Sequence, residues 1–115
     1  MRLILAIAAF TAFATHANAH AFLVRSDPAV GTTVGAAPKM LRLEFSEGLE
    51  LPFCGVDVTG SSGALKVGKP RFADATDKVL AVDLPALQPG NYQVKWHVVS
   101  ADTHRTEGDF SFSLK

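Results

Sequence analysis

Beyond residue 20 the sequence alternates between apolar and polar side chains, and this pattern restricts the chain to an all-β fold. Leu41, Leu43 and Phe45 alternate with polar residues, and the same period recurs at 80–84, 92–98 and 110–114. A period of two is that of a strand with one buried face. No segment after residue 20 has the 3.6-residue period of a long amphipathic helix, so we expect strands throughout.

Clusters of Gly, Pro, Ser and Asn separate these segments and predict turns at 26–28, 35–38, 60–63 and 89–91. Further short strands are expected at 22–25, 56–59 and 65–67, which gives about seven strands in all. Short strands with frequent turns are typical of an antiparallel sandwich, and a length near 100 residues suits an immunoglobulin-like one. Within the strand at 92–98, Tyr92 resembles a tyrosine corner, and Trp96 is expected in the core.

Length, charge and cysteine content limit the classes of function. A chain of 115 residues is expected to form one domain. Its formal net charge of zero gives no positive field for sequence-independent binding of nucleic acid. Cys54 is the single cysteine, which excludes an internal disulfide, and we expect it to be a small buried side chain.

Residues 1–19 have the pattern of a cleavable secretory signal. Arg2 precedes an apolar stretch at 3–14 that only Thr11 interrupts, and small residues follow at Ala17 and Ala19. Since a membrane-spanning helix needs roughly 20 apolar residues, a signal is favoured over a retained anchor. We therefore expect export to the periplasm, a mature domain at 20–115, and no stable membrane insertion after processing.

Cleavage after Ala19 would make His20 the first residue of the exported chain. Its free amine and its imidazole Nδ1 could then bind the same metal ion. Such nitrogens favour Cu(II) among the divalent first-row ions, and they bind only when deprotonated, so affinity should fall on acidification. Because a cleavage site can expose any residue, His20 alone is a weak indication of a metal site.

Asp102 and His104 form a second candidate pair. With one residue between them, they would share a face if the local backbone is extended. Their even numbers continue the inward phase of the strand at 92–98, which predicts a position near the core at the end of the sandwich. The alternative is a hydrogen-bonded pair on a surface loop.

Glu47 follows the inward phase of Leu43 and Phe45 and predicts a partly buried carboxylate. Such a group needs a cation or a donor, which the His20 amine or Arg105 could supply. Glu47 would then orient the amine or act as a weak ligand. The alternative is a solvated glutamate at a strand end. His97 has the opposite phase from Trp96, and we expect it on the surface.

Together, His20, Asp102 and His104 offer three nitrogens and one carboxylate oxygen, a donor set suited to Cu(II). Zinc accepts similar donors but prefers a closed tetrahedron. Met40 is the only methionine after residue 20 and Cys54 stands alone, so one chain cannot assemble a soft site for Cu(I). These residues predict one Cu(II) per mature chain.

Three blocks of sequence resemble the CopC family of periplasmic copper-binding and copper-resistance proteins. They are His-Ala-Phe-Leu-Val-Arg-Ser-Asp-Pro-Ala-Val-Gly at 20–31, Leu-Arg-Leu-Glu-Phe-Ser-Glu at 41–47, and the run from Tyr92 to Gly108 that contains Trp-His-Val-Val-Ser-Ala-Asp-Thr-His. The resemblance implies an all-β fold, a Greek-key β-barrel or sandwich of the immunoglobulin-like or cupredoxin-like type. It also implies a Cu(II) site at His20, Asp102 and His104, with Glu47 at the family's acidic position beside the amine.

Two departures from the family pattern stand out. Residues 60–77 contain no methionine where members with a Cu(I) site have a methionine-rich loop, which implies a member that binds Cu(II) only. Arg105 stands where some relatives have proline.

The resemblance further implies a carrier or buffer of copper, not an enzyme, with a CopD-type inner-membrane copper importer as a recipient. Two alternatives remain open. One is a small copper-dependent oxidative enzyme with an N-terminal histidine brace, like the lytic polysaccharide monooxygenases. The other is a metal-free β-sandwich that serves as an interaction module.

Overall fold

A computed structural model describes residues 20–115 of the chain, and the predicted signal segment at 1–19 lies outside the described residues. The regular secondary structure of the described part consists of strands and one 3-10 turn. In chain order the elements are β1 (Leu23–Asp27), β2 (Thr33–Val34), β3 (Met40–Phe45), the 3-10 turn η1 (Leu51–Phe53), β4 (Gly55–Gly60), β5 (Gly63–Ala64), β6 (Arg71–Phe72), β7 (Val79–Asp83), β8 (Gly90–Val99) and β9 (Arg105–Leu114).

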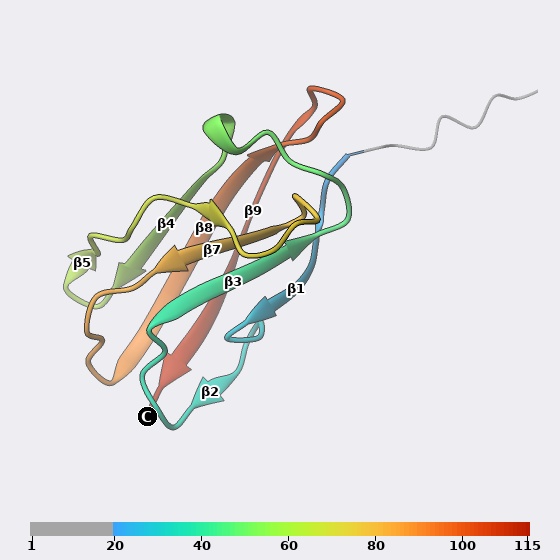
Figure 1. Ribbon diagram of the computed structural model, residues 1–115. Coiled ribbons are helices and arrows are strands. Elements are labelled where there is room, and N and C mark those ends of the chain that lie inside the picture. Colours follow the sequence, from blue (N-terminus) through green and yellow to red (C-terminus); the bar gives the residue numbers. More distant parts are fainter. Residues whose placement is uncertain (1–19) are drawn as a thin grey trace, which may run out of the picture.

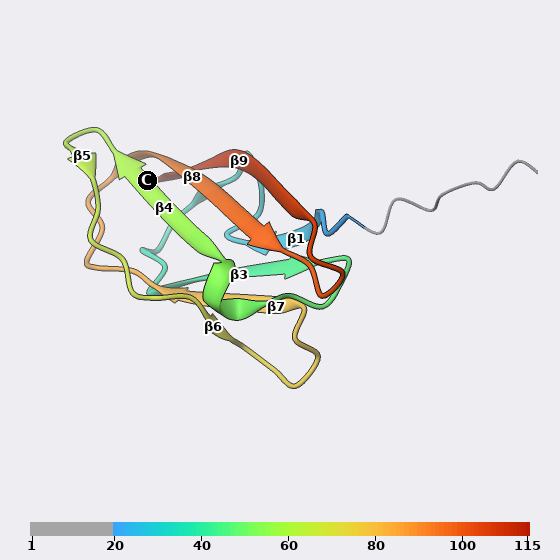
Figure 2. The same cartoon turned by 90° about the horizontal axis from the view of Figure 1, so that it is seen from above.

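The strands form two facing sheets (Figures 1 and 2). One sheet has the order β1-β3-β7-β6 and the other the order β2-β9-β8-β4-β5. Neighbouring strands are antiparallel except β2 and β9, which run parallel. Chain neighbours such as β3 and β4 lie in different sheets, as in a Greek-key sandwich. The predicted all-β Greek-key fold is thus confirmed.

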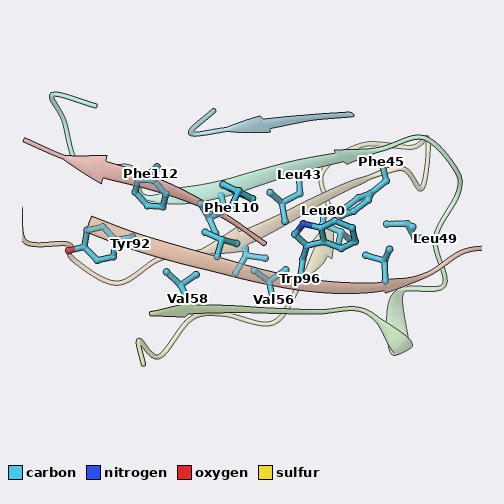
Figure 3. Packing of buried hydrophobic residues seen from close by; sticks show 14 of the residues in the cluster. Leu43, Phe45, Leu49, Val56, Val58, Leu80, Tyr92, Trp96, Phe110 and Phe112 are labelled. Atoms are coloured by element: carbon cyan, nitrogen blue, oxygen red, sulfur yellow. The ribbon is translucent and has the colours of Figure 1, made fainter. Parts of the chain in front are cut away.

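The core fills the space between the sheets, as the alternating pattern predicts (Figure 3). Leu43 and Leu80 are fully buried and stand opposite each other on β3 and β7. Trp96 is only 8% exposed and packs edge-on against Phe45 with ring centroids 5.1 Å apart, which confirms its place in the core. The Tyr92 hydroxyl donates to the carbonyl of Gln88, as expected of a tyrosine corner.

One strand assignment from the sequence is wrong, and another is confirmed but too short. Residues 65–67 form no strand, although the Leu65 amide still donates to the Val58 carbonyl at 2.8 Å. The strand expected at 110–114 begins five residues earlier, at Arg105. The segment 105–109 is polar apart from Gly108, and it is a strand because its backbone pairs along the full length of β8. Backbone pairing of this kind does not require an alternation of apolar and polar residues, so the sequence does not reveal it.

The two longest strands, β8 and β9, determine where the site lies. Each has ten residues, and a turn at 100–104 joins them. Figure 1 shows this turn at the same end of the sandwich as η1, the loop after β3 and the start of the described chain. Within residues 20–115, no helix has the length and apolar character required to span a membrane.

Candidate metal site

The turn between β8 and β9 carries two of the three predicted ligands. Its first residue, Ser100, is 1% exposed, and its amide donates to the His104 carbonyl at 2.9 Å. The Thr103 amide donates to the Ser100 carbonyl at 2.8 Å, and Thr103 has a left-handed φ of 72°. The backbone at Asp102–His104 is therefore not extended, because the chain reverses direction there, and the condition for a shared strand face is not met.

The tight turn nevertheless brings the two side chains together. Nδ1 of His104 lies 3.1 Å from Oδ2 of Asp102. The pair lies on a surface loop, as the alternative predicts, and not near the core, with side-chain exposure of 58% for His104 and 38% for Asp102. Regular pairing ends at Val99, so the inward phase of β8 does not extend to residue 102.

The buried Ser100 binds the carboxylate of Asp102. The Ser100 hydroxyl donates to Oδ1 of Asp102, and this hydrogen bond is the main reason that the pKa of Asp102 lies below its ordinary value. The nearby His104 lowers this pKa further. Asp102 is thus kept ionised, which suits an oxygen donor or the partner of a metal-bound imidazole.

His20 reaches this turn from the beginning of the described chain. The rings of His20 and His104 meet edge-on with centroids 4.6 Å apart. His20 is half-buried, and its Nδ1 is a buried atom with no hydrogen-bond partner among the described residues. A buried ring nitrogen without a partner is expensive, and a bound metal ion would satisfy it.

Glu47 does not have the partial burial that the alternation predicts. β3 ends at Phe45, and Glu47 is exposed in the loop that follows. Its neighbours nevertheless connect both parts of the site: the Ser46 amide donates to the Phe22 carbonyl at 3.0 Å, and the Gly48 carbonyl accepts from Ala101 at 2.9 Å. Glu47 therefore lies on the backbone segment between the His20 arm and the β8–β9 turn.

Three other candidate side chains have partners other than His20 and His104. Arg105, a suggested partner of Glu47, is instead 3.7 Å from Glu107. Cys54 is half-buried, not fully buried as expected, and its thiol donates to the Glu50 carbonyl at 3.3 Å. His97 is also half-buried, since its ring lies over Gly55 on the outer face of the second sheet.

The predicted ligands form two adjoining pairs, His20 with His104 and His104 with Asp102. In the part of the chain at 20–115, no group of three or more His, Cys, Asp or Glu side chains is arranged to hold a metal ion. The donors that the pairs present, imidazole nitrogen and carboxylate oxygen, fit a copper or zinc ion. Because Asp102 occupies Nδ1 of His104, Nε2 is the nitrogen left for a metal.

Sequence reasoning missed three hydroxyl residues that shape the site. Ser100 supports Asp102, whereas Ser46 and Thr106 bind the backbone beside His20. Thr106 could have been found, because its even number places a polar residue in the inward phase of β9. Ser100 carries the same signal, since its even number continues the inward phase of β8, whereas Ser46 carries none.

Known proteins resemble the chain along most of its length. A family model described as the CopC domain matches residues 23–115. Protein YobA of Escherichia coli strain K12 is 42% identical over 99 residues, covering 84% of this chain and 80% of that protein. Copper resistance protein C of Pseudomonas syringae pv. tomato is 37% identical over 106 residues, covering 86% and 83%. Copper transport protein CutJ of Bacillus subtilis strain 168 is 31% identical over 98 residues, which are 84% of this chain but 18% of that protein.

Solved structures agree with these relatives. The crystal structure of CopC from Methylosinus trichosporium OB3b superposes with a TM-score of 0.77 at 31% identity, covering 84% of this chain and 94% of that one. PcoC, a methionine-rich copper resistance protein from Escherichia coli, gives a TM-score of 0.76 at 31% identity, with 84% and 100% covered. With the family model matched from β1 to the last residue, the chain belongs to the CopC domain family.

Proposed function

We propose that the protein is a periplasmic Cu(II)-binding protein that carries or buffers copper and does not catalyse a reaction. The observation that carries this proposal is the meeting of His20 and His104, whose rings lie 4.6 Å apart although they come from distant parts of the sequence. The names of the relatives support copper as the ion, since they include copper resistance and copper transport proteins.

In this proposal residues 1–19 are a secretory signal, and their removal frees the amine of His20. The amine and Nδ1 of His20, a ring nitrogen of His104 and a carboxylate oxygen of Asp102 then hold one Cu(II) per chain, and Asp102 leaves Nδ1 of His104 in order to reach the ion. Four donors of this kind match the tetragonal preference of Cu(II). Glu47, on the segment beside the arm, orients the amine or acts as a weak ligand.

The proposal favours Cu(II) over Cu(I) because soft ligands are scarce. PcoC is described as methionine-rich, whereas residues 60–77 of this chain contain no methionine. Cu(I) prefers thioether and thiolate sulfur. Met40 and Cys54 lie on β3 and directly after η1, and neither belongs to the turn that carries Asp102 and His104.

Delivery to a CopD-type inner-membrane importer is the proposed next step for the ion. The match to CutJ supports it, because the segment similar to this chain makes up 18% of a larger copper transport protein. In CutJ the similar segment is part of the copper transport protein itself. We propose that the separate domain described here donates copper to a separate transporter in the same way. Exposure of His104 and Asp102 at the end of the sandwich leaves the ion within reach of such a partner.

The test is a Cu(II) titration of protein that begins at His20, followed by EPR and with a competing chelator to set the affinity. We expect one Cu(II) per chain, a sharp loss of affinity when one residue is added before His20, and a changed spectrum for His104→Ala. The matched control is His97→Ala, which removes a histidine on the outer face and should leave affinity and spectrum unchanged. Equal affinity with and without the added residue would rule out the amine as a ligand.

A further inference from the structure

The arm that carries His20 is held by hydroxyl groups before the first strand begins. The Thr106 hydroxyl donates to the Ala21 carbonyl at 2.6 Å, joining residues 85 apart in sequence. On the other side, the Phe22 amide donates to the Ser46 hydroxyl at 3.0 Å, and the Ser46 amide donates to the Phe22 carbonyl at 3.0 Å. The arm is thus fixed between the start of β9 and the end of β3.

Thr106 is the contact that joins the arm to the strand of the metal site. It follows His104 by two residues and stands opposite Val98 in the β8–β9 pair. Its phase on β9 is that of the buried Phe110, so its side chain points toward the interior, where Ala21 is fully buried. The inward hydroxyl and the buried carbonyl each need a hydrogen-bond partner, and each satisfies the other.

We propose that Thr106 is a positioning residue whose hydroxyl sets the register of the arm, so that His20 stands beside His104. This inference rests on the proposed function for its effect on copper. A shift of the arm by one residue would turn His20 to the opposite face of the extended chain. Ligands held in place before binding lose less conformational freedom when the ion arrives, so the bond raises affinity without contacting the metal.

The first experiment compares Thr106→Val with Thr106→Ser in protein that begins at His20. Valine keeps the shape and the branched carbon but lacks the hydroxyl, whereas serine keeps the hydroxyl. One hydrogen bond is worth about 0.5–1.5 kcal/mol, so the Cu(II) dissociation constant of Thr106→Val should rise about two- to tenfold. Thr106→Ser should stay near the unaltered protein.

The chain offers a matched control at Thr32. Its hydroxyl donates to the Ala29 carbonyl at 2.7 Å in the loop between β1 and β2, away from the turn that holds His104. Thr32→Val also removes a hydrogen bond from a threonine hydroxyl to a carbonyl, in this case an exposed one, and should leave Cu(II) affinity unchanged. An equal loss of affinity in Thr32→Val and Thr106→Val would overturn the positioning role, because a general loss of stability would then explain both.

A second comparison ties the effect to the arm. His20→Ala with one residue added before it removes both nitrogens that the arm contributes, and Thr106→Val should then cause no further loss of affinity, which a double-mutant cycle measures. A Thr106→Val effect of the same size in this background would overturn the inference.

Nuclear Overhauser effects in the metal-free protein separate this inference from the proposed function. The signals between the ring protons of His20 and His104 should weaken in Thr106→Val and persist in Thr106→Ser. Undiminished signals in Thr106→Val would refute the positioning role whether or not the protein binds copper. If these signals weaken as expected but the unaltered protein does not bind Cu(II), only the proposed function is refuted.

Discussion

Substitution of Gly108 by alanine tests how tightly Trp96 is packed below the site. Gly108 stands opposite Trp96 in the β8–β9 pair. A Cβ at residue 108 would lie 2.5 Å from Cζ2 and 2.9 Å from Cε2 of the indole. Trp96 is 8% exposed and rests against Phe45, so the ring can move away only by displacing the core.

The magnitude follows from two opposing effects. Inserting a methyl group into a packed core typically costs about 1–3 kcal/mol. Alanine in a strand is favoured over glycine by roughly 0.5–1 kcal/mol, because glycine loses more backbone freedom on folding. Taking the middle of each range, the free energy of unfolding of Gly108→Ala should fall by about 1 kcal/mol, with a melting temperature lower by roughly 4–8 °C.

Gly55→Ala is the control for this prediction. Its Cβ would come even closer to Cε1 of His97 than a Cβ at Gly108 comes to the indole. His97, however, is only half-buried on the outer face, and its ring can rotate into solvent at little cost. Gly55→Ala should remain within about 0.5 kcal/mol of the unaltered protein, as expected of surface changes.

The assay is urea unfolding of the metal-free protein from residue 20, followed by circular dichroism. If distance alone decided the cost, Gly55→Ala would be the more damaging change. A loss of stability in Gly55→Ala equal to or larger than that in Gly108→Ala would refute the argument that burial of the ring decides the outcome.

Three further predictions concern single groups. Ser100→Ala removes the hydroxyl that lowers the pKa of Asp102, so an NMR titration should find this pKa raised. A pKa that is lowered in the folded protein stabilises the folded state at pH values above the ordinary pKa of aspartate, and this stabilisation is lost as the pH falls through the lowered pKa. Ser100→Ala should therefore lose less stability on acidification than the unaltered protein. An unchanged pKa of Asp102 in the variant would contradict both expectations. Burial raises the pKa of the Cys54 thiol, so the midpoint of its alkylation rate should lie at higher pH in the folded protein than in urea, and coincident midpoints would contradict this. Tyr92→Phe removes the hydroxyl bond to Gln88 and should cost about 1 kcal/mol in urea unfolding without changing Cu(II) affinity, whereas an unchanged midpoint would show the bond to be neutral.

The fold was predictable because its core follows a simple periodicity. Leu41, Leu43 and Phe45 alternate in the sequence and are all buried in the structure. The limits of β9 were not predictable, since backbone pairing with β8, and not side-chain pattern, extends the strand back to Arg105. Strand propensity and hydrophobic pattern depend on side chains, so they do not predict how far backbone pairing with a neighbouring strand extends a strand.

The candidate site was predictable in its residues but not in its geometry. The residue types and the family resemblance selected His20, Asp102 and His104, and the structure brings the histidine rings together. The left-handed Thr103 reverses the chain, so the side chains of Asp102 and His104 meet outside the core and not within it. A single residue with positive φ is difficult to foresee when it is not glycine.

The antiparallel pairing of β8 and β9 also separates the tail of the chain from the metal-binding turn. Leu114 pairs with Gly90 and Arg105 with Val99, so Lys115 lies one full strand length, roughly 30 Å, from His104. A linker, membrane tether or fusion joined at Lys115 would leave the opposite tip unobstructed. The sandwich can therefore be attached through Lys115 while the metal-binding turn stays accessible. This arrangement suits both immobilisation on a surface and incorporation into a longer polypeptide.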